Sequence, residues 1–176
     1  MKDIIKPIIV LASICLIVTA VLAYVNMMTQ PVIKAAEEEA AAQARTEVLS
    51  AATEFKKLDV KKLPEGVTEV YKGNNDSGYV VLMESKGYGG TIKFICGIHN
   101  DGTIESCKTL SHSETSGVGT KAVDNGSVFR KGFEGKTKAD YNNVDVVSGA
   151  TISSNAYKKA IGQALDAFEV IKEAGV

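Results

Sequence analysis

The chain has 176 residues, enough for about one domain and a short appendage. Its 20 Lys and Arg residues nearly balance 21 Asp and Glu residues, the net charge is −1, and no long stretch is dominated by one sign. This balance argues against a nucleic-acid-binding protein, which would carry a basic face. With 16 Gly, 3 Pro and 45% apolar residues, the composition is that of a folded globular protein.

The first apolar segment is long enough to cross a membrane. Pro7–Tyr24 contains 18 uncharged residues, and the run continues to Met28, which reaches the roughly 20 residues that a bilayer requires. Lys2 and Lys6 stand directly before the run, and this mild excess of cations favours a cytoplasmic N-terminus. We therefore expect residues 1–30 to form a single-pass anchor in the cell (inner) membrane, with the C-terminal domain outside the cytoplasm.

Two other interpretations of this segment compete with an anchor. A cleaved signal peptide has small residues available at Val21 and Ala23, but the apolar run exceeds the usual ~7–15 residues. A lipoprotein anchor on Cys15 is disfavoured, because Ile14 stands where a small residue is needed. We predict that Cys15 faces lipid or packs against a neighbouring side chain.

Residues 31–62 are predicted to connect the anchor to the domain. Pro31–Leu58 is rich in Ala and Glu, has no Gly, and has Pro only at its start, which favours one long helix. An apolar stripe runs through its second half, and its Ala-rich first half is expected to act as a spacer or to contact a partner. A low-complexity linker is the alternative. The stripe consists of Val48, Leu49, Ala52 and Phe55.

The globular domain is predicted to span residues 63–176 and to be α+β. Asn, Asp and Gly between His99 and Gly102 supply the positive φ of a tight hairpin, which indicates an antiparallel β-meander. An apolar face from Ser154 to Glu173 predicts a C-terminal helix, and strands followed by a helix favour the α+β class. The expected strands are Thr68–Lys72, Gly78–Glu84, Gly90–Ile98 and Thr103–Leu110.

A two-residue turn centred on Asp101 and Gly102 would place Cys96 directly opposite Cys107. A disulfide is open to this pair in an oxidising compartment, but we favour two buried thiols. His99 and His112 lack the Cys or carboxylate neighbours of a metal site, so we predict no metal. Zinc spacings, a Walker loop, a nucleophile elbow and a dinucleotide-binding GxGxxG are all absent from the sequence, and we predict no catalytic side chain.

The stretch Asp145–Asn155 (DVVSGATISSN) places hydroxyl groups directly before the C-terminal helix. Ser153 or Ser154 is the expected N-cap. A helix start offers unpaired N–H groups and a partial positive charge, which stabilise a phosphate. The Thr151 hydroxyl just upstream could be esterified to such a phosphate. The plain alternative is a capped helix after a turn.

Three segments of the chain resemble the covalent FMN-binding domain family. Its flavinylation motif is similar to Ser148, Gly149, Ala150 and Thr151, with Asp145 before them and Ser153 after them. Lys86–Ile92 (KGYGGTI) and His112–Gly119 (HSETSGVG) look like two further loops, although Ser116 stands where Pro is expected and Val118 is a conservative change. With the anchor, the resemblance extends to the G subunit of the Rnf ferredoxin:NAD oxidoreductase complex and to the C subunit of the sodium-pumping NADH:quinone reductase, and the compact length favours Rnf.

The resemblance implies an electron carrier with FMN held by a phosphoester to Thr151. A separate flavin transferase would attach the FMN, and other Rnf subunits would carry the NAD and ferredoxin sites, so this chain alone would lack a complete active site. Phe129 and Phe133 are expected either to stack on the flavin or to lie in the core. Further expected cofactor contacts are Tyr88, Gly89, Gly90, His112, Glu114, Thr115, Gly117, Val118, Gly119 and Ser154.

Two alternative functions stay open from the sequence. A stand-alone, membrane-anchored extracytoplasmic flavoprotein would also need only this motif and an anchor. A cofactor-free binding or scaffold domain on a membrane anchor would use the SGAT residues only as a capped turn.

Overall fold

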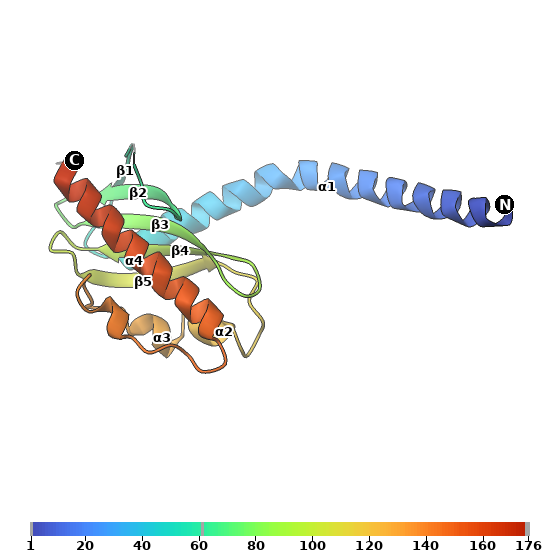
Figure 1. The fold of residues 1–176 in the computed structure, drawn as a ribbon. Helices are drawn as coiled ribbons and strands as arrows, with labels where there is room; N and C mark the ends of the chain where they lie inside the picture. The colour runs from blue at the N-terminus through green and yellow to red at the C-terminus, as the bar shows by residue number, and fades with distance from the viewer. Residues whose placement is uncertain (1, 61, 175–176) are drawn as a thin grey trace. The chain divides into compact units, whose positions relative to one another are not determined.

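The computed structural model describes residues 2–60 and 62–174, and its ribbon is shown in Figure 1. Contacts divide the chain into two units, Met1–Ala40 and Ala41–Val176. The first unit is formed by most of helix α1 (Lys2–Val48), which continues without a break past Pro31. The predicted anchor and connecting helix are therefore parts of one helix.

The apolar part of α1 has the properties of a membrane span. Within the described residues, it is the one helix long and apolar enough to cross a bilayer. Ile8, Leu11 and Leu16 are 59%, 64% and 71% exposed, and the most apolar stretch of the helix has no buried residue. The Thr19 hydroxyl donates to the carbonyl oxygen of Cys15 at 2.7 Å, which satisfies the hydroxyl without water. Cys15 itself is exposed.

Helix α1 ends at Val48, and the predicted continuation to Leu58 is wrong. After a turn, Phe55–Leu58 forms the short strand β1, whose Leu58 pairs with Val70 and is buried. Pairing with the neighbouring strand and burial of Leu58 outweigh the local helix propensity of this Ala-rich stretch. The compact unit begins at Ala41, well before the predicted domain start at residue 63.

Within residues 2–60 and 62–174, five antiparallel strands form one sheet in the order β1-β2-β3-β4-β5, which confirms the predicted meander. The hairpin between the last two strands is also confirmed, because Gly102 has φ +87° and the His99 N–H donates to the Thr103 oxygen at 2.8 Å. Each predicted strand agrees with an observed one to within a few residues. The strands after β1 are β2 (Val67–Gly73), β3 (Tyr79–Lys86), β4 (Thr91–Ile98) and β5 (Ile104–Ser111).

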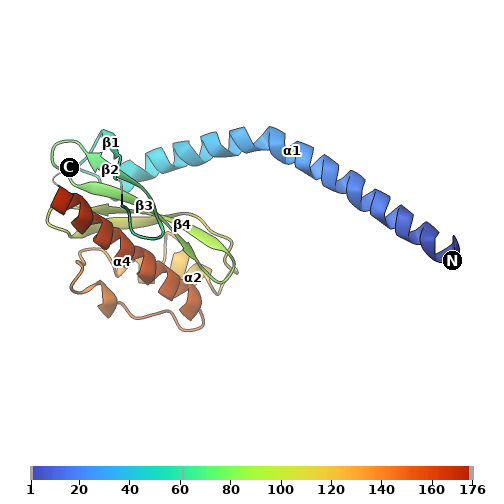
Figure 2. The same ribbon diagram turned by 45° about the horizontal axis from the view of Figure 1, so that its top comes forward.

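Helix α4 (Thr151–Ala174) covers one face of the sheet, as the views in Figures 1 and 2 both show. Its buried side chains pack against the strand residues that point to this face of the sheet. Together they form the larger of two hydrophobic clusters. The predicted C-terminal helix is confirmed, with a start three positions earlier than expected. Members of this core include Val81, Met83, Phe94, Tyr157, Ile161 and Leu165.

The other face of the sheet is covered by the end of α1 and the turn that follows it. Val48 and Leu49 pack there against Val80 and Ile95. The approach is close: a Cβ on Gly97 would overlap the carbonyl oxygen of Val48. These residues are part of the folded domain because they cover its second apolar face.

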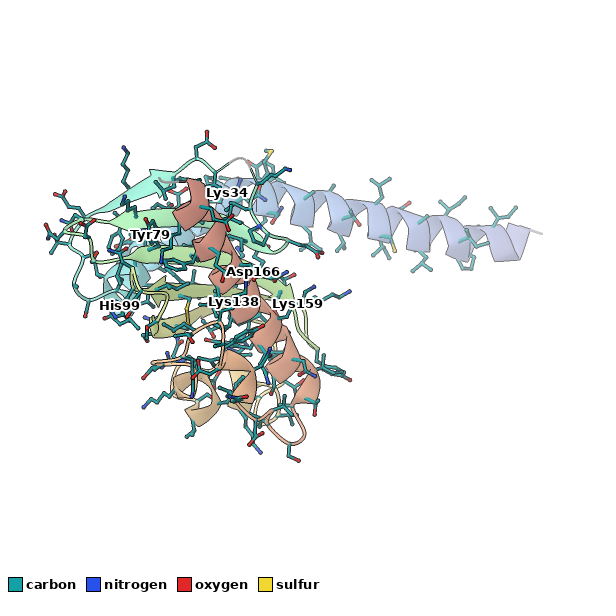
Figure 3. All side chains as sticks on the ribbon, turned by 60° about the vertical axis from the view of Figure 1, so that its left-hand side comes forward. Lys34, Tyr79, His99, Lys138, Lys159 and Asp166 are labelled. Atoms are coloured by element: carbon teal, nitrogen blue, oxygen red, sulfur yellow. A yellow bond between two sulfur atoms is a disulfide. The ribbon has the colours of Figure 1, made fainter. Side chains whose placement is uncertain are left out.

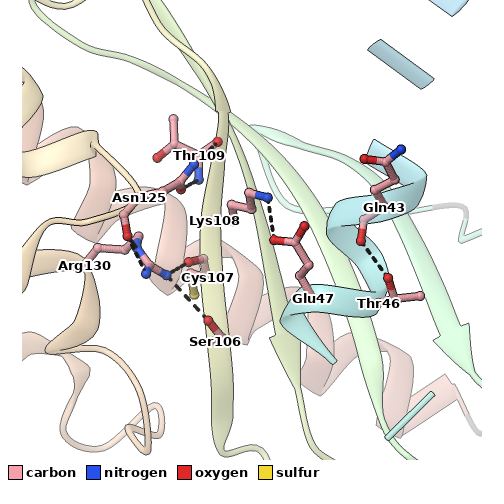
Figure 4. Close-up of polar contacts among 9 residues, drawn as sticks. All are labelled: Gln43, Thr46, Glu47, Ser106, Cys107, Lys108, Thr109, Asn125 and Arg130. Atoms are coloured by element: carbon pink, nitrogen blue, oxygen red, sulfur yellow. Dashed lines mark hydrogen bonds and ion pairs between the residues drawn. The ribbon is translucent and has the colours of Figure 1, made fainter. Parts of the chain in front are cut away.

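The outer edge of β5 is covered by the segment containing α2 (Thr120–Val123) and α3 (Val128–Lys131). Figure 4 shows the Asn125 side chain bonded to the Thr109 backbone, accepting from its N–H at 2.8 Å and donating to its oxygen at 3.1 Å. Buried Arg130 donates to the carbonyl oxygen of Cys107. These bonds occupy backbone groups that would otherwise be open to another strand.

Cys96 and Cys107 are joined by a disulfide, so our expectation of two free thiols is wrong. The predicted pairing is confirmed, since the two residues are direct partners with Cα atoms 4.1 Å apart. The predicted two-residue turn is wrong: the His99 N–H donates to the Thr103 oxygen around a longer loop, and a register shift between Gly97 and Ile98 brings the two cysteines opposite each other. The Cys107 oxygen points to the sheet edge, where it accepts from Arg130, and not toward β4. The pair therefore occupies a non-hydrogen-bonded position, where opposed side chains come closest.

The segment after α3 is tied to α4 by charged side chains. Figure 3 shows Lys138 and Asp166 close together, and their charged atoms are 2.8 Å apart. Hydrogen bonds to Asp166 and Glu169 raise the pKa of Lys138 above its ordinary value. The segment includes the 3-10 helix η1 (Tyr141–Asn143), and it leads into the loop before α4. This loop carries the residues predicted to form the functional site.

Candidate functional site

The three loops singled out in the sequence meet at the buried carboxylate of Glu114. Its Oε1 accepts from the Gly89 N–H at 3.0 Å, and its Oε2 accepts from the Ser153 hydroxyl at 2.6 Å. Glu114 is only 8% exposed. One side chain therefore joins the turn between β3 and β4, the loop after β5 and the first turn of α4.

Glycines make room for this arrangement. A Cβ on Gly87 or on Gly119 would overlap an oxygen of the Glu114 carboxylate, and a Cβ on Gly89 would overlap the carbonyl oxygen of Ser113. Gly90 has φ +147°, a conformation that residues with a Cβ rarely adopt. The glycines of the β3–β4 turn and of the loop after β5 therefore permit the backbone to approach Glu114 closely.

The loop before α4 is fixed by bonds that the sequence did not predict. Ser154 N–H donates to the Ala150 oxygen at 2.9 Å, so the predicted N-cap at Ser153 or Ser154 is wrong. Both serines are buried inside the first turn. The Ser154 hydroxyl accepts from the Val147 N–H at 3.1 Å, while Ser153 bonds to Glu114.

Thr151 is the first residue of α4 and is exposed. Its N–H and those of Ile152 and Ser153 precede the first intrahelical bond, so they form the partly positive end of the helix. Gly149 has φ +82° and open space where a side chain would begin, and Asp145 and Ser148 are also exposed. The Thr151 hydroxyl is thus accessible beside an anion-stabilising helix start.

Apolar side chains are exposed on these same loops. Tyr88 is 73% exposed and Ile152 is 57% exposed. They are the sequence neighbours of Gly89 and Ser153, the two residues that bond to the Glu114 carboxylate. Val118 and Val146 are 48% and 40% exposed. A group with an anionic phosphate and an apolar ring would find a partner for each part here, so the residues fit FMN.

Three further residues predicted to contact the cofactor, His112, Thr115 and Gly117, lie in the loop after β5. His112 Nδ1 accepts from the Glu114 N–H at 3.2 Å, and its Nε2 lies 3.2 Å from an Asp124 carboxylate oxygen. His112 therefore supports the loop from the side of α2, where it also lines a pocket with residues 109–111 and 123–125. Thr115 and Gly117 are exposed, and the Thr115 oxygen accepts from the Val118 N–H at 3.2 Å.

Phe129 and Phe133 belong to the core. Their rings pack against each other and against buried Tyr157, with centroids 5.2–5.9 Å apart. Among the described residues no cluster of three or more His, Cys, Asp or Glu side chains could hold a metal ion.

Lys158 is a structural contributor that the sequence did not reveal. Its Nζ donates to the carbonyl oxygens of Asn142 and Val144 at 2.8 Å each, which holds the stretch before Asp145 against α4. No local pattern distinguishes Lys158 from an ordinary solvent-facing lysine, since its partners lie in a loop whose path depends on the whole fold.

Comparison with known proteins gives the same picture. The FMN-binding domain family model matches residues 87–166, which include all three loops, and the RnfG N-terminal region model matches residues 1–48. The structure of NqrC from Shewanella oneidensis shares the fold, with a TM-score of 0.50 and 21% identity over 71% of each chain. The chain therefore combines a segment that matches the FMN-binding domain with an apolar N-terminal helix, and the predicted α+β fold is confirmed.

Full-length relatives define the family further. The G subunit of the proton-translocating ferredoxin:NAD(+) oxidoreductase complex of Clostridium ljungdahlii is 32% identical, over 86% of this chain and 84% of the relative. The G subunit of the ion-translocating oxidoreductase complex of Methanosarcina acetivorans is also 32% identical, over 94% of each chain. This chain belongs to the RnfG family, the G subunits of ion-translocating oxidoreductase complexes, as its sequence motifs predicted.

Proposed function

We propose that this chain is the electron-carrying subunit of an ion-translocating ferredoxin:NAD+ oxidoreductase, with FMN attached covalently to Thr151 through a phosphoester. The observation that carries the proposal is the position of Thr151, exposed at the first residue of the 24-residue helix α4 and following a glycine with φ +82°. When bound, FMN supplies the electron transfer chemistry, while the protein sets its position and surroundings.

The side chains of the site divide into two roles in this proposal. Backbone N–H groups at the start of α4 stabilise the phosphate, and Tyr88, Val118 and Ile152 provide apolar contact for the ring. Asp145 and Ser148 are exposed, so a flavin transferase can reach them as it recognises the loop. Glu114, Ser153 and Ser154 are buried and hold the loops behind this surface.

The location that we propose is the cell (inner) membrane, crossed once by α1, with the N-terminus in the cytoplasm and the FMN-binding domain outside. The exposed apolar surface of α1 supports the anchor. The Cys96–Cys107 disulfide supports an oxidising compartment for the domain. Other subunits of the complex would carry the ferredoxin and NAD sites. Protection of the domain from protease added to right-side-out vesicles would contradict this orientation.

The central test is intact-mass analysis of the full chain purified from its native host. Wild-type protein should carry the mass of one FMN, and Thr151→Ala should lack it with little change in stability, because one exposed hydroxyl is removed. Ser148→Ala removes a neighbouring exposed hydroxyl from the loop that the transferase would recognise, and it should reduce FMN attachment less than Thr151→Ala does. Membranes with Thr151→Ala should lose ferredoxin:NAD oxidoreductase activity.

Two results would replace this proposal. An unmodified wild-type chain from the native host would favour the cofactor-free scaffold. Covalent FMN on a chain that purifies without other subunits, in membranes whose ferredoxin:NAD activity survives Thr151→Ala, would favour a stand-alone flavoprotein.

A further inference from the structure

Glu114 contacts all three loops of the site from beneath its surface. Both oxygens of its carboxylate are engaged, by the Gly89 N–H and by the Ser153 hydroxyl, and its own N–H donates to His112. A hydrogen bond to an ionised carboxylate is about twice as strong as one between neutral groups. This residue is therefore the main polar connection between the loops.

The carboxylate is enclosed by its hydrogen-bond partners and by two glycines, so we infer that it acts through these neighbours. Gly87 and Gly119 lie so close that a Cβ on either would overlap its oxygens, and the residue is 8% exposed. Our sequence-based expectation placed Glu114 among the groups that touch FMN. The structure instead gives it contacts with residues that neighbour the exposed surface.

The bond to Ser153 fixes the rotation of the first turn of α4. Successive helical residues are rotated by about 100°, so Ser153 and Thr151 point about 200° apart around the axis. Holding Ser153 inward against Glu114 therefore holds Thr151 outward, where it is exposed. The bond to Gly89 fixes the turn that carries exposed Tyr88 in the same way.

We propose that Glu114 is a positioning residue for the attachment of FMN to Thr151. This inference depends on the function proposed above. In the transfer, the Thr151 oxygen forms a bond to the FMN-side phosphorus of FAD held by the transferase, the pyrophosphate bond breaks, AMP leaves, and the hydroxyl proton passes to solvent or to a base of the transferase. Glu114 acts through Ser153 and Gly89 to keep the hydroxyl in one orientation.

The experiment uses the full chain in detergent, produced without a flavin transferase, and then mixed with transferase, FAD and Mg2+. Flavin attachment is followed by intact mass, and thermal unfolding of each unmodified variant is measured in parallel. Glu114→Ala, Glu114→Gln and Ser153→Ala are compared with wild type. Glu173→Gln, which removes an exposed carboxylate near the other end of α4, is the charge control, and Thr151→Ala is the blank.

Glu114→Ala should slow attachment by about tenfold to a hundredfold, the range expected when a reacting group is misplaced by ~1 Å. The KM for FAD should not change, because FAD binds to the transferase. Glu114→Gln should restore most of the rate, since its amide oxygen can accept from Gly89 and its amide nitrogen can donate to the Ser153 hydroxyl. Ser153→Ala, which loses one of the two bonds, should fall between them.

Several outcomes would overturn the inference. Attachment to Glu114→Ala or Ser153→Ala at the wild-type rate would exclude positioning. A Glu114→Gln protein that melts like wild type yet is modified as slowly as Glu114→Ala would assign the effect to charge. If Glu114→Ala does not fold, Glu114→Gln and Ser153→Ala decide the question. A wild-type chain that gains no FMN, or a Thr151→Ala blank that does, would overturn the proposed function together with this inference.

Discussion

Replacing Gly97 with Ala should destabilise the domain by driving the end of α1 away from the sheet. Gly97 lies on β4 opposite the carbonyl oxygen of Val48, and an added Cβ would overlap that oxygen. The obstacle is backbone and cannot rotate away. The added Cβ would lie 2.0 Å from that oxygen, so either the α1 end shifts by about 1 Å or more, or it leaves the sheet.

The magnitudes favour the shift. Overpacking a close contact costs about 1–3 kcal/mol. Undocking would expose Val48 and Leu49, which are 1% and 0% exposed, at about 1.5–3 kcal/mol for each side chain. We therefore expect Gly97→Ala to lose about 1–3 kcal/mol, which lowers the unfolding temperature by roughly 3–12 °C for a domain of this size.

The assay is thermal unfolding of the full chain in detergent, followed by near-UV circular dichroism, with hydrogen exchange at the end of α1 as a local probe. Gly126→Ala is the matched control, because a Cβ on Gly126 would have no neighbour within 4 Å and this glycine has no positive φ. That variant should stay within about 0.5 kcal/mol of wild type. Equal stability of the two variants would refute the packing of the α1 end on β4.

Other features of the domain give three further predictions. Cys96 and Cys107 should react with a thiol reagent in denaturant only after reduction, and labelling without a reductant would show that the thiols are free. Replacing both cysteines with Ser should lower the free energy of unfolding by about 2–4 kcal/mol. Gly149→Ala should lower the free energy of unfolding by about 1 kcal/mol, because Gly149 has a positive φ that Ala adopts only with strain, although no atom would touch the added Cβ. Unchanged stability would mean that this backbone conformation is not required. The Thr103 N–H donates to the Asp101 carboxylate and lowers the pKa of that carboxyl group. The ionised Asp101 therefore stabilises the fold above the pKa of the unfolded state, and this stabilisation is lost as the pH falls through the pKa of the folded state. Asp101→Asn should flatten the fall in stability below about pH 4, and an unchanged pH profile would argue against this contribution.

Much of the sheet could be predicted because its signals are local. The short strand-like runs of β3 to β5 and the Asn, Asp and Gly residues between them specify strands and a hairpin from neighbouring residues alone. Strand β1 was missed because Phe55–Leu58 follows an Ala-rich helix and becomes a strand only through pairing with β2. Long-range pairing of this kind leaves no trace in the local sequence.

The site shows the same division. Its loops were recognised from their motifs, but the roles of Ser153, Ser154 and Glu114 depend on contacts made across the fold. A serine at a helix start is ordinarily a cap, and here two of them are turned inward instead. The disulfide was misjudged for a related reason. The sequence placed the two cysteines opposite each other, but the choice between thiols and a bond depends on the compartment and on the hydrogen-bonding pattern of the ladder, which the local sequence does not show.

The accessible position of Thr151 has a consequence for the order of biogenesis. The residue lies on the outside of a finished fold, and none of the core side chains depends on it. If Thr151 carries FMN as proposed, the transferase can act on the folded protein, and the unmodified chain can fold without its cofactor. The supply of cofactor would then limit how much of the protein is active without limiting how much of it is made.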